Sequence, residues 1–128
     1  MLELADQYLQ SWSYWDVASG GVFWDNEGNP LLDRVKVFTR PYPPATAGTP
    51  LRLYFDPATR VAEYEFMPDA SIDAPTVLYV PDLVYDEGFD IDVEEGITWE
   101  TIDEQTVHVT VDKSITDSVL ITIRPIVK

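Results

Sequence analysis

The sequence has no cysteine, a single histidine, and only 8 lysine and arginine residues against 23 aspartate and glutamate residues. Without cysteine the chain can form no disulfide and offers no thiolate for catalysis or metal binding. The formal net charge of −15 repels nucleic-acid phosphates and anionic membrane surfaces, so neither is expected as a partner. The same acidity fits a protein from a saline setting, although acidic chains also occur elsewhere.

Long hydrophobic runs are also missing. No segment approaches the roughly 18 apolar residues of a membrane-spanning helix, so we expect no transmembrane segment. The stretch Met1–Asp6 lacks the basic start of a signal peptide. We therefore expect either an intracellular chain or one whose natural start is not Met1, and the sequence leaves the localisation open.

What the chain does contain is enough for one folded domain, or for a small domain with an attached fragment. It has 128 residues, of which 45% are hydrophobic, a proportion typical of globular proteins.

A proline-rich seam divides the chain. Thr39–Pro50 holds four prolines and one glycine, which no helix can span and no central strand accommodates. Tyr42 among these prolines predicts a joint that packs against both neighbours, with an ordinary proline-rich loop as the alternative.

Before the seam the pattern is mixed. Apolar residues at helical spacing predict that Met1–Gln10 is the end of a helix. Alternating small and aromatic residues over Ser11–Trp15 predict a short strand. Leu31–Thr39 has the apolar spacing of a helix, for which Asn29 would be the N-cap and Pro30 the first helical residue.

After the seam the hydrophobic period changes to two. The two alternating runs Leu51–Phe55 and Ala62–Phe66, separated by a turn at Asp56–Thr59, predict a hairpin. Five further short strands are predicted around residues 76–80, 91–93, 97–102, 107–111 and 119–123. Seven strands at this spacing are typical of an antiparallel, immunoglobulin-like β-sandwich, so the fold class is mainly β.

Several residues of this part could in principle form a site. The acidic residues Asp90, Asp92, Glu94 and Glu95 could bind calcium, but the first three alternate along a strand as a solvated face does, and we expect no metal site and no cofactor. His108 has no second histidine or cysteine with which to share a metal. Tyr54 and Trp99 could form a carbohydrate platform, although aromatic residues are as common in sandwich cores.

The order of these parts, and particular residues within them, carry a resemblance to a known family. These residues are Ala5-Asp6 leading to Ser11–Trp15, Leu31-Leu32, Arg40–Pro43, Ala47–Leu51, Asp73–Thr76, and Val80-Pro81 with Tyr85 and Gly88. The chain resembles the C-terminal end of an endoglycosylceramidase-like enzyme of glycoside hydrolase family five. The resemblance implies that residues 1–39 are a remnant of a catalytic TIM barrel, namely its last strand and helix. Residues 40–50 would be the seam, and residues 51–128 the C-terminal β-sandwich.

The resemblance also implies a function for the parent enzyme, which would hydrolyse O-glycosyl bonds of glycolipids. Such enzymes retain configuration with two glutamates about 5 Å apart. In the family both glutamates lie on earlier barrel strands, so this chain would contain no catalytic residue and would not act alone. Trp12 matches the position whose indole stacks on the sugar, and Tyr14 and Trp15 are further substrate-binding candidates. The expected partners are the barrel of the parent enzyme or a second copy, and a glycolipid or oligosaccharide substrate; the parent could be secreted.

The sequence also allows a function of a different class. The chain could be a stand-alone acidic β-sandwich that binds carbohydrate or a protein partner.

Overall fold

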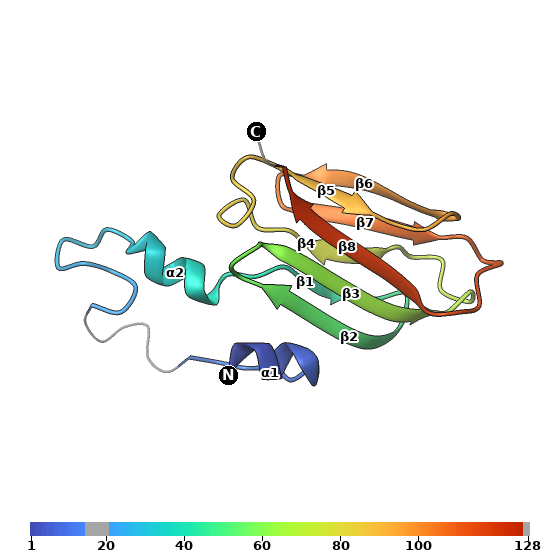
Figure 1. Cartoon of the computed structure of the whole chain (residues 1–128), viewed down its shortest axis with the longest axis horizontal. Helices are drawn as coiled ribbons and strands as arrows, with labels where there is room; N and C mark the ends of the chain where they lie inside the picture. Colours follow the sequence, from blue (N-terminus) through green and yellow to red (C-terminus); the bar gives the residue numbers. More distant parts are fainter. Residues whose placement is uncertain (15–20, 127–128) are drawn as a thin grey trace.

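The chain forms two packed β-sheets with a helical segment at one side (Figure 1). This computed structural model describes residues 1–14 and 21–126. Within them lie two helices and eight strands: α1 (Leu2–Gln7), α2 (Leu32–Phe38), β1 (Tyr42–Ala45), β2 (Gly48–Asp56), β3 (Val61–Pro68), β4 (Thr76–Tyr79), β5 (Phe89–Asp92), β6 (Ile97–Asp103), β7 (Thr106–Val111) and β8 (Val119–Pro125). Neither helix has the length and apolar composition needed to cross a bilayer.

The two sheets have four strands each, in the orders β1-β4-β7-β6 and β2-β3-β8-β5, and all pairs are antiparallel. Strand alternation explains the core between them. Along β3, Ala62, Tyr64 and Phe66 are buried, while the residues between them face outward. The predicted β-sandwich is confirmed, and all seven predicted strands are present.

The eighth strand is β1, which lies inside the proline-rich seam. Pro43 and Pro44 of β1 and Pro50 of β2 have no N–H to donate, and both strands are edge strands on the same side of the sandwich. An edge strand needs partners on one side only, so the prolines are tolerated. The seam is also joined to the sandwich by Ala47, whose N–H donates to Thr76 Oγ1 at 3.0 Å.

Gly48 begins β2 where the backbone approaches β3 very closely. Its φ is +152°, and a Cβ built there would lie 2.0 Å from the carbonyl oxygen of Met67. No side chain fits at this distance, so the chain can enter the sandwich here only through glycine.

Two predictions before the seam are wrong in detail. Residues 11–14 form no strand, and of the Ser11–Trp15 prediction only Trp15 lies outside the described residues. The helix predicted at 31–39 is present as α2, but Asn29 is not its N-cap. Instead Asp25 accepts hydrogen bonds from the Asn29 backbone at 2.8 Å and from its side-chain amide at 2.9 Å, which lowers the pKa of Asp25. Asn29 therefore closes the preceding turn, and Leu31 is the N-cap.

Candidate functional site

Two of the three residues predicted to bind sugar meet at one aromatic ring. Phe38, the last residue of α2, lies with its ring centroid 6.0 Å from that of Trp12 and 5.1 Å from that of Tyr14. Phe23 completes this aromatic cluster, with centroids 5.4 Å from Tyr14 and 5.1 Å from Phe38. These separations are those of favourable edge and tilted ring contacts. The cluster holds Trp12 and Tyr14 without burying them, since each remains 40% exposed.

The third predicted residue, Trp15, lies outside the described residues. Its role in substrate binding stays a prediction.

Trp12 also lines an open groove of about 800 Å³ beside the edge strands of the sandwich. The groove lies between α1 with the residues after it and the sandwich side that carries β1 and β2. Its lining is mainly apolar and aromatic, with a few polar groups: Ala5, Asp6, Leu9, Gln10, Ser11, Trp12, Phe38, Thr39, Arg40, Tyr42, Pro43, Pro50, Leu53 and Tyr79. Tyr14 is not part of this lining, so the two predicted residues present different surfaces.

A buried ion pair fixes one wall of this groove. Asp6 of α1 accepts a hydrogen bond from the guanidinium of Arg40, and both side chains are more than nine-tenths buried. The Arg40 guanidinium also lies 5.6 Å from the ring centroid of Phe55, a core residue of β2. Burial raises the pKa of Asp6, although Arg40 opposes this shift. The pair ties α1 and the seam to the sandwich core.

Because Asp6 is the only carboxylate in the described lining and is paired with Arg40, the groove offers no couple of acids for glycoside hydrolysis. What the site can supply is a set of flat apolar rings next to hydrogen-bonding groups. That combination suits binding of a sugar or an apolar side chain rather than bond cleavage.

Sequence reasoning missed a second aromatic contact in the groove. Tyr42 of β1 and Tyr79 of β4 are register partners, and their ring centroids are 5.3 Å apart. The Tyr79 hydroxyl donates to Gln105 Oε1 at 3.0 Å, and burial raises its pKa. Tyr42 stood out among the prolines of the seam, but Tyr79 carried no signal because its role depends on the pairing of β1 with β4.

The residues of the sandwich that could bind a metal ion or a sugar make local contacts instead. Asp92 pairs with Arg124 at 2.6 Å, and the described residues hold no group of three or more side chains suited to a metal ion. The guanidinium of Arg52 lies over the Tyr54 ring, and Trp99 packs against the core, 6.3 Å from Phe89. His108 lies partly exposed on β7 between Val77 and Glu100 of the neighbouring strands.

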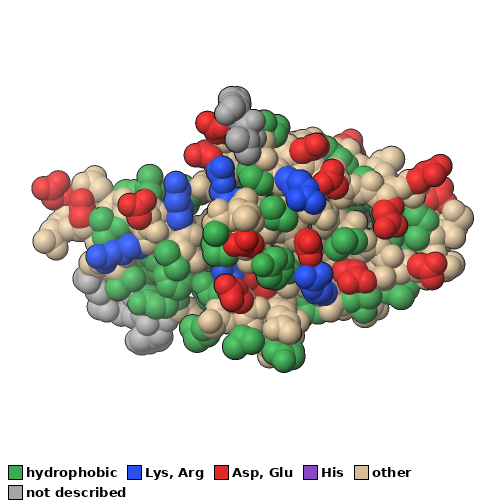
Figure 2. All heavy atoms as spheres, in the orientation of Figure 1, with side chains coloured by type: hydrophobic (Ala, Val, Ile, Leu, Met, Phe, Trp, Pro, Cys, Tyr) green, Lys and Arg blue, Asp and Glu red, His purple; other side chains and the backbone are tan. Residues whose placement is uncertain are grey.

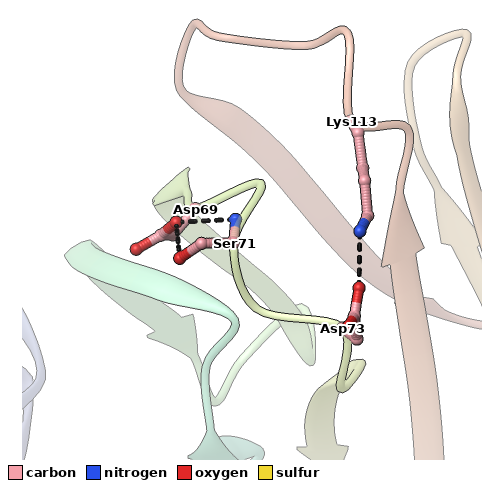
Figure 3. Close-up of polar contacts among 4 residues, drawn as sticks. All are labelled: Asp69, Ser71, Asp73 and Lys113. Atoms are coloured by element: carbon pink, nitrogen blue, oxygen red, sulfur yellow. Dashed lines mark hydrogen bonds and ion pairs between the residues drawn. The ribbon is translucent and has the colours of Figure 1, made fainter.

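A separate polar contact joins loops of the sandwich away from the groove (Figure 3). Asp69 accepts hydrogen bonds from the backbone N–H and hydroxyl of Ser71 at 2.9 and 2.7 Å, which lower its pKa. Asp73 pairs with Lys113 at 2.5 Å, which lowers the pKa of Asp73. Each carboxylate has its own partner, so these residues fasten the loops.

The fold and the groove define the class of protein: an antiparallel β-sandwich with an aromatic groove at its N-terminal side. Residues 40–124 match the model of the glycoside hydrolase family 5 C-terminal domain, and the chain belongs to this family. The resemblance seen in the sequence is thereby confirmed.

Within this family, individual relatives show that the chain is endoglycoceramidase-like. The chain is 36% identical to endoglycoceramidase I of Rhodococcus hoagii over 74% of this chain and 18% of that protein. It is 27% identical to an endoglycoceramidase of Cyanea nozakii, covering 84% of this chain and 24% of the relative. Among solved structures, endo-glycoceramidase II from Rhodococcus sp. in complex with ganglioside GM3 superposes with a TM-score of 0.74 and 28% identity, over 96% of this chain and 26% of that one.

The chain therefore spans about a fifth to a quarter of the length of these relatives.

Proposed function

We propose that this chain is the C-terminal part of an endoglycoceramidase-like hydrolase that releases the glycan of a glycolipid. In this proposal residues 1–39 complete a catalytic TIM barrel with its last helix and, once the neighbouring barrel strands are present to pair with residues 11–15, its last strand. Residues 40–50 form the joint, and residues 51–128 form the accessory sandwich. The chain contributes the end of the substrate site and no catalytic glutamate, so it does not hydrolyse glycosides alone.

The observation that carries the proposal is the extent of the structural match. The family model begins at residue 40, but the likeness to endo-glycoceramidase II covers 96% of the chain, and nearly all of residues 1–39 must be included. The match therefore supports the assignment of these residues to the same enzyme as the sandwich. That relative is described in complex with ganglioside GM3 and as a lactosyl-enzyme intermediate, which favours a glycolipid as the substrate class of this chain's parent.

The aromatic cluster gives the N-terminal segment its role in this proposal. Trp12 is held by Phe38 on one side and exposes 40% of its surface. The C–H faces of a pyranose pack well on such a ring. In a TIM barrel the strand ends line the active site, so an indole at this place would stack on the sugar next to the cleaved bond. In this proposal Tyr14 and Trp15 are further sugar-binding residues, with Tyr14 placed outside the groove that Trp12 lines.

The test is a chimera in which this chain replaces the matching C-terminal part of endo-glycoceramidase II. We expect the chimera to hydrolyse ganglioside GM3, and Trp12→Ala to lower kcat/KM by about 10- to 100-fold, equivalent to about 1.4–2.7 kcal/mol. Trp24→Ala is the matched control, since Trp24 is 47% exposed and lies outside the cluster; it should leave kcat/KM unchanged. Hydrolysis by the isolated 128-residue chain that survives repurification, or a chimera indifferent to Trp12→Ala, would contradict the proposal.

The alternative of a stand-alone carbohydrate module rests on Tyr54. The ring of this residue is partly covered by Arg52, which is itself paired with Glu63 at 2.9 Å. Titration of the isolated chain with the GM3 oligosaccharide separates the two functions, because a stand-alone Tyr54 platform would bind the sugar without a barrel and Tyr54→Ala would abolish that binding.

A further inference from the structure

The two outer faces of the sandwich differ in charge. Figure 2 shows acidic and basic side chains interspersed on the side of the molecule that carries β2, β3 and β8 in the orientation of Figure 1. On this face Arg52 pairs with Glu63 at 2.9 Å, and Arg124 pairs with Asp92 at 2.6 Å. Charged side chains are costly to remove from water, so this face is suited to remain solvated.

The opposite face belongs to the β1-β4-β7-β6 sheet and carries very little charge. Val107 and Val109 of β7 are buried in the core, so the residues that alternate with them point outward. The strand register gives their outward neighbours on β1, β4 and β6. The described residues of this face are Tyr42, Ala45, Val77, Tyr79, Thr98, Glu100, Thr106, His108 and Thr110. Glu100 is the only acid among these described residues and none is lysine or arginine, although the chain has a formal net charge of −15.

Tyr79 gives this face an aromatic ring that is fixed by two contacts. Tyr42 packs against it with ring centroids 5.3 Å apart, and the Tyr79 hydroxyl donates to Gln105 Oε1 at 3.0 Å. Thr106 is the register partner of Tyr79 on β7, and His108 follows on the same side of that strand. A partly exposed ring beside hydroxyl and imidazole groups offers an apolar surface together with hydrogen-bond donors and acceptors.

The composition of this face determines the class of ligand that it suits. Its described residues include no lysine or arginine with which to pair a phosphate, sulfate or carboxylate. A protein partner would need a more apolar centre than Ala45 and Val77 provide. An uncharged sugar fits better, since its C–H face can cover the ring while its hydroxyls exchange hydrogen bonds with the threonine and histidine side chains. Covering this face removes few charges from water.

We propose that the outer face of β4, β7 and β6 is a binding site for a neutral oligosaccharide, with Tyr79 as the residue that stacks on a sugar ring. Tyr79 also lines the groove, but the part of the site on β7 and β6 lies outside the groove lining. The site is therefore separate from the surface of Trp12 and does not depend on the proposed function. Three strands give it a width of about 10 Å, enough for more than one sugar ring.

The experiment is a titration of the isotope-labelled chain with cellotetraose, an uncharged tetrasaccharide, followed by backbone amide chemical shifts. We expect saturable shifts confined to β4, β6, β7 and the turn at Gln105. Tyr79→Ala should weaken binding about tenfold through loss of the stacking ring, and Thr110→Glu, which adds a second carboxylate to the face, should weaken it by a similar factor. Tyr54→Ala and Leu120→Glu are matched controls with exposed side chains on the outer face of the other sheet, and should bind like the unmodified chain.

Three results would overturn the inference. The first is the absence of saturable shifts with cellotetraose. The second is equal weakening by Thr110→Glu and Leu120→Glu, a comparison that holds even where Tyr79→Ala does not fold. The third is tighter binding of the anionic GM3 oligosaccharide than of cellotetraose through the same amides, because this face has no cation for its carboxylate. A chimera that hydrolyses GM3 while the isolated chain fails to bind cellotetraose would reject this site and leave the proposed function standing.

Discussion

The two regions of this chain place their apolar side chains in opposite ways. In the sandwich, the apolar residues of β3, β4, β7 and β8 alternate inward, and Phe66, Leu78, Val107 and Ile121 are almost inaccessible to solvent. In residues 1–39, Leu4, Trp12, Trp24, Leu32 and Val37 are all at least 40% exposed. The sandwich buries its own core, whereas the N-terminal region leaves these side chains exposed to solvent.

The two regions also differ in charge, and the difference follows from the same cause. A surface that faces water tolerates carboxylates, so the sandwich carries 17 of the 23 acidic residues. A surface that is to be covered cannot, because burying an unpaired charge is costly. Among the described residues of the N-terminal region, Asp6 is the one buried carboxylate, and it is paired with Arg40. The N-terminal region therefore combines low charge with exposed aromatic rings.

The largest expected difference between the regions lies in the cost of removing an apolar side chain. Phe66→Ala opens a cavity in a fully buried site of β3 and should lower the free energy of unfolding by about 3–5 kcal/mol. Leu32→Ala removes a half-exposed side chain from α2 and should change it by no more than about 0.5 kcal/mol. Urea unfolding of both variants measures the two values. Similar costs at both positions would mean that residues 1–39 share the core of the sandwich.

A second difference concerns how tightly the backbone is confined. Gly48→Ala should cost about 3 kcal/mol, at the upper end for overpacking, because the added Cβ would overlap the Met67 carbonyl oxygen at the entry to β2. Gly21→Ala is the matched control, since Gly21 also has a positive φ, +86°, but has no atom within 4 Å of the added Cβ. It should cost only about 1 kcal/mol of backbone strain. Thermal unfolding compares them, and equal costs would show that the approach of β2 to β3 is not restrictive.

The contact between the two regions can be weakened by removing the buried ion pair between Asp6 and Arg40. Asp6→Asn leaves Arg40 without its charged partner and should cost about 1–3 kcal/mol, with faster proteolysis of α1. Asp33→Asn, at an exposed position in the first turn of α2, is the control and should have little effect.

The pH dependence of this cost has a defined sign. Burial raises the pKa of Asp6, so the native state binds its proton more readily than the unfolded chain does. Protonation of Asp6 therefore stabilises the native state. This stabilisation is fully present below the ordinary aspartate pKa and is lost as pH rises through the raised pKa of Asp6. The difference in stability between the unmodified chain and Asp6→Asn should therefore be larger near pH 3 than near pH 6. The opposite trend would show that the attraction of Arg40 outweighs burial.

The sandwich was predictable from the sequence because period-two alternation is a local signal that the two-layer core enforces. β1 was missed, since Tyr42-Pro43-Pro44-Ala45 shows no alternation and its pairing with β4 is non-local. The strand predicted at Ser11–Trp15 is wrong over residues 11–14, because aromatic propensity makes no strand without a neighbouring strand. Trp12 and Tyr14 were found through the family resemblance, whereas the Tyr42–Tyr79 contact required the register.

The smallest expected effect is the response to salt, which should come mainly from the sandwich. Its excess acidic charge is self-repelling, and raising the ionic strength from 0.1 to 1 M shortens the reach of that repulsion from about 10 Å to about 3 Å. The thermal midpoint should rise with sodium chloride by a few degrees, equivalent to about 1 kcal/mol. Replacing the exposed pair Glu94 and Glu95 by glutamine should reduce this rise. The same replacement of Glu3 and Glu27, two exposed residues of the less charged N-terminal region, should reduce it less, because fewer like charges surround them. Equal reductions would mean that the repulsion acts over the whole chain, and that the two regions differ in their apolar surface alone.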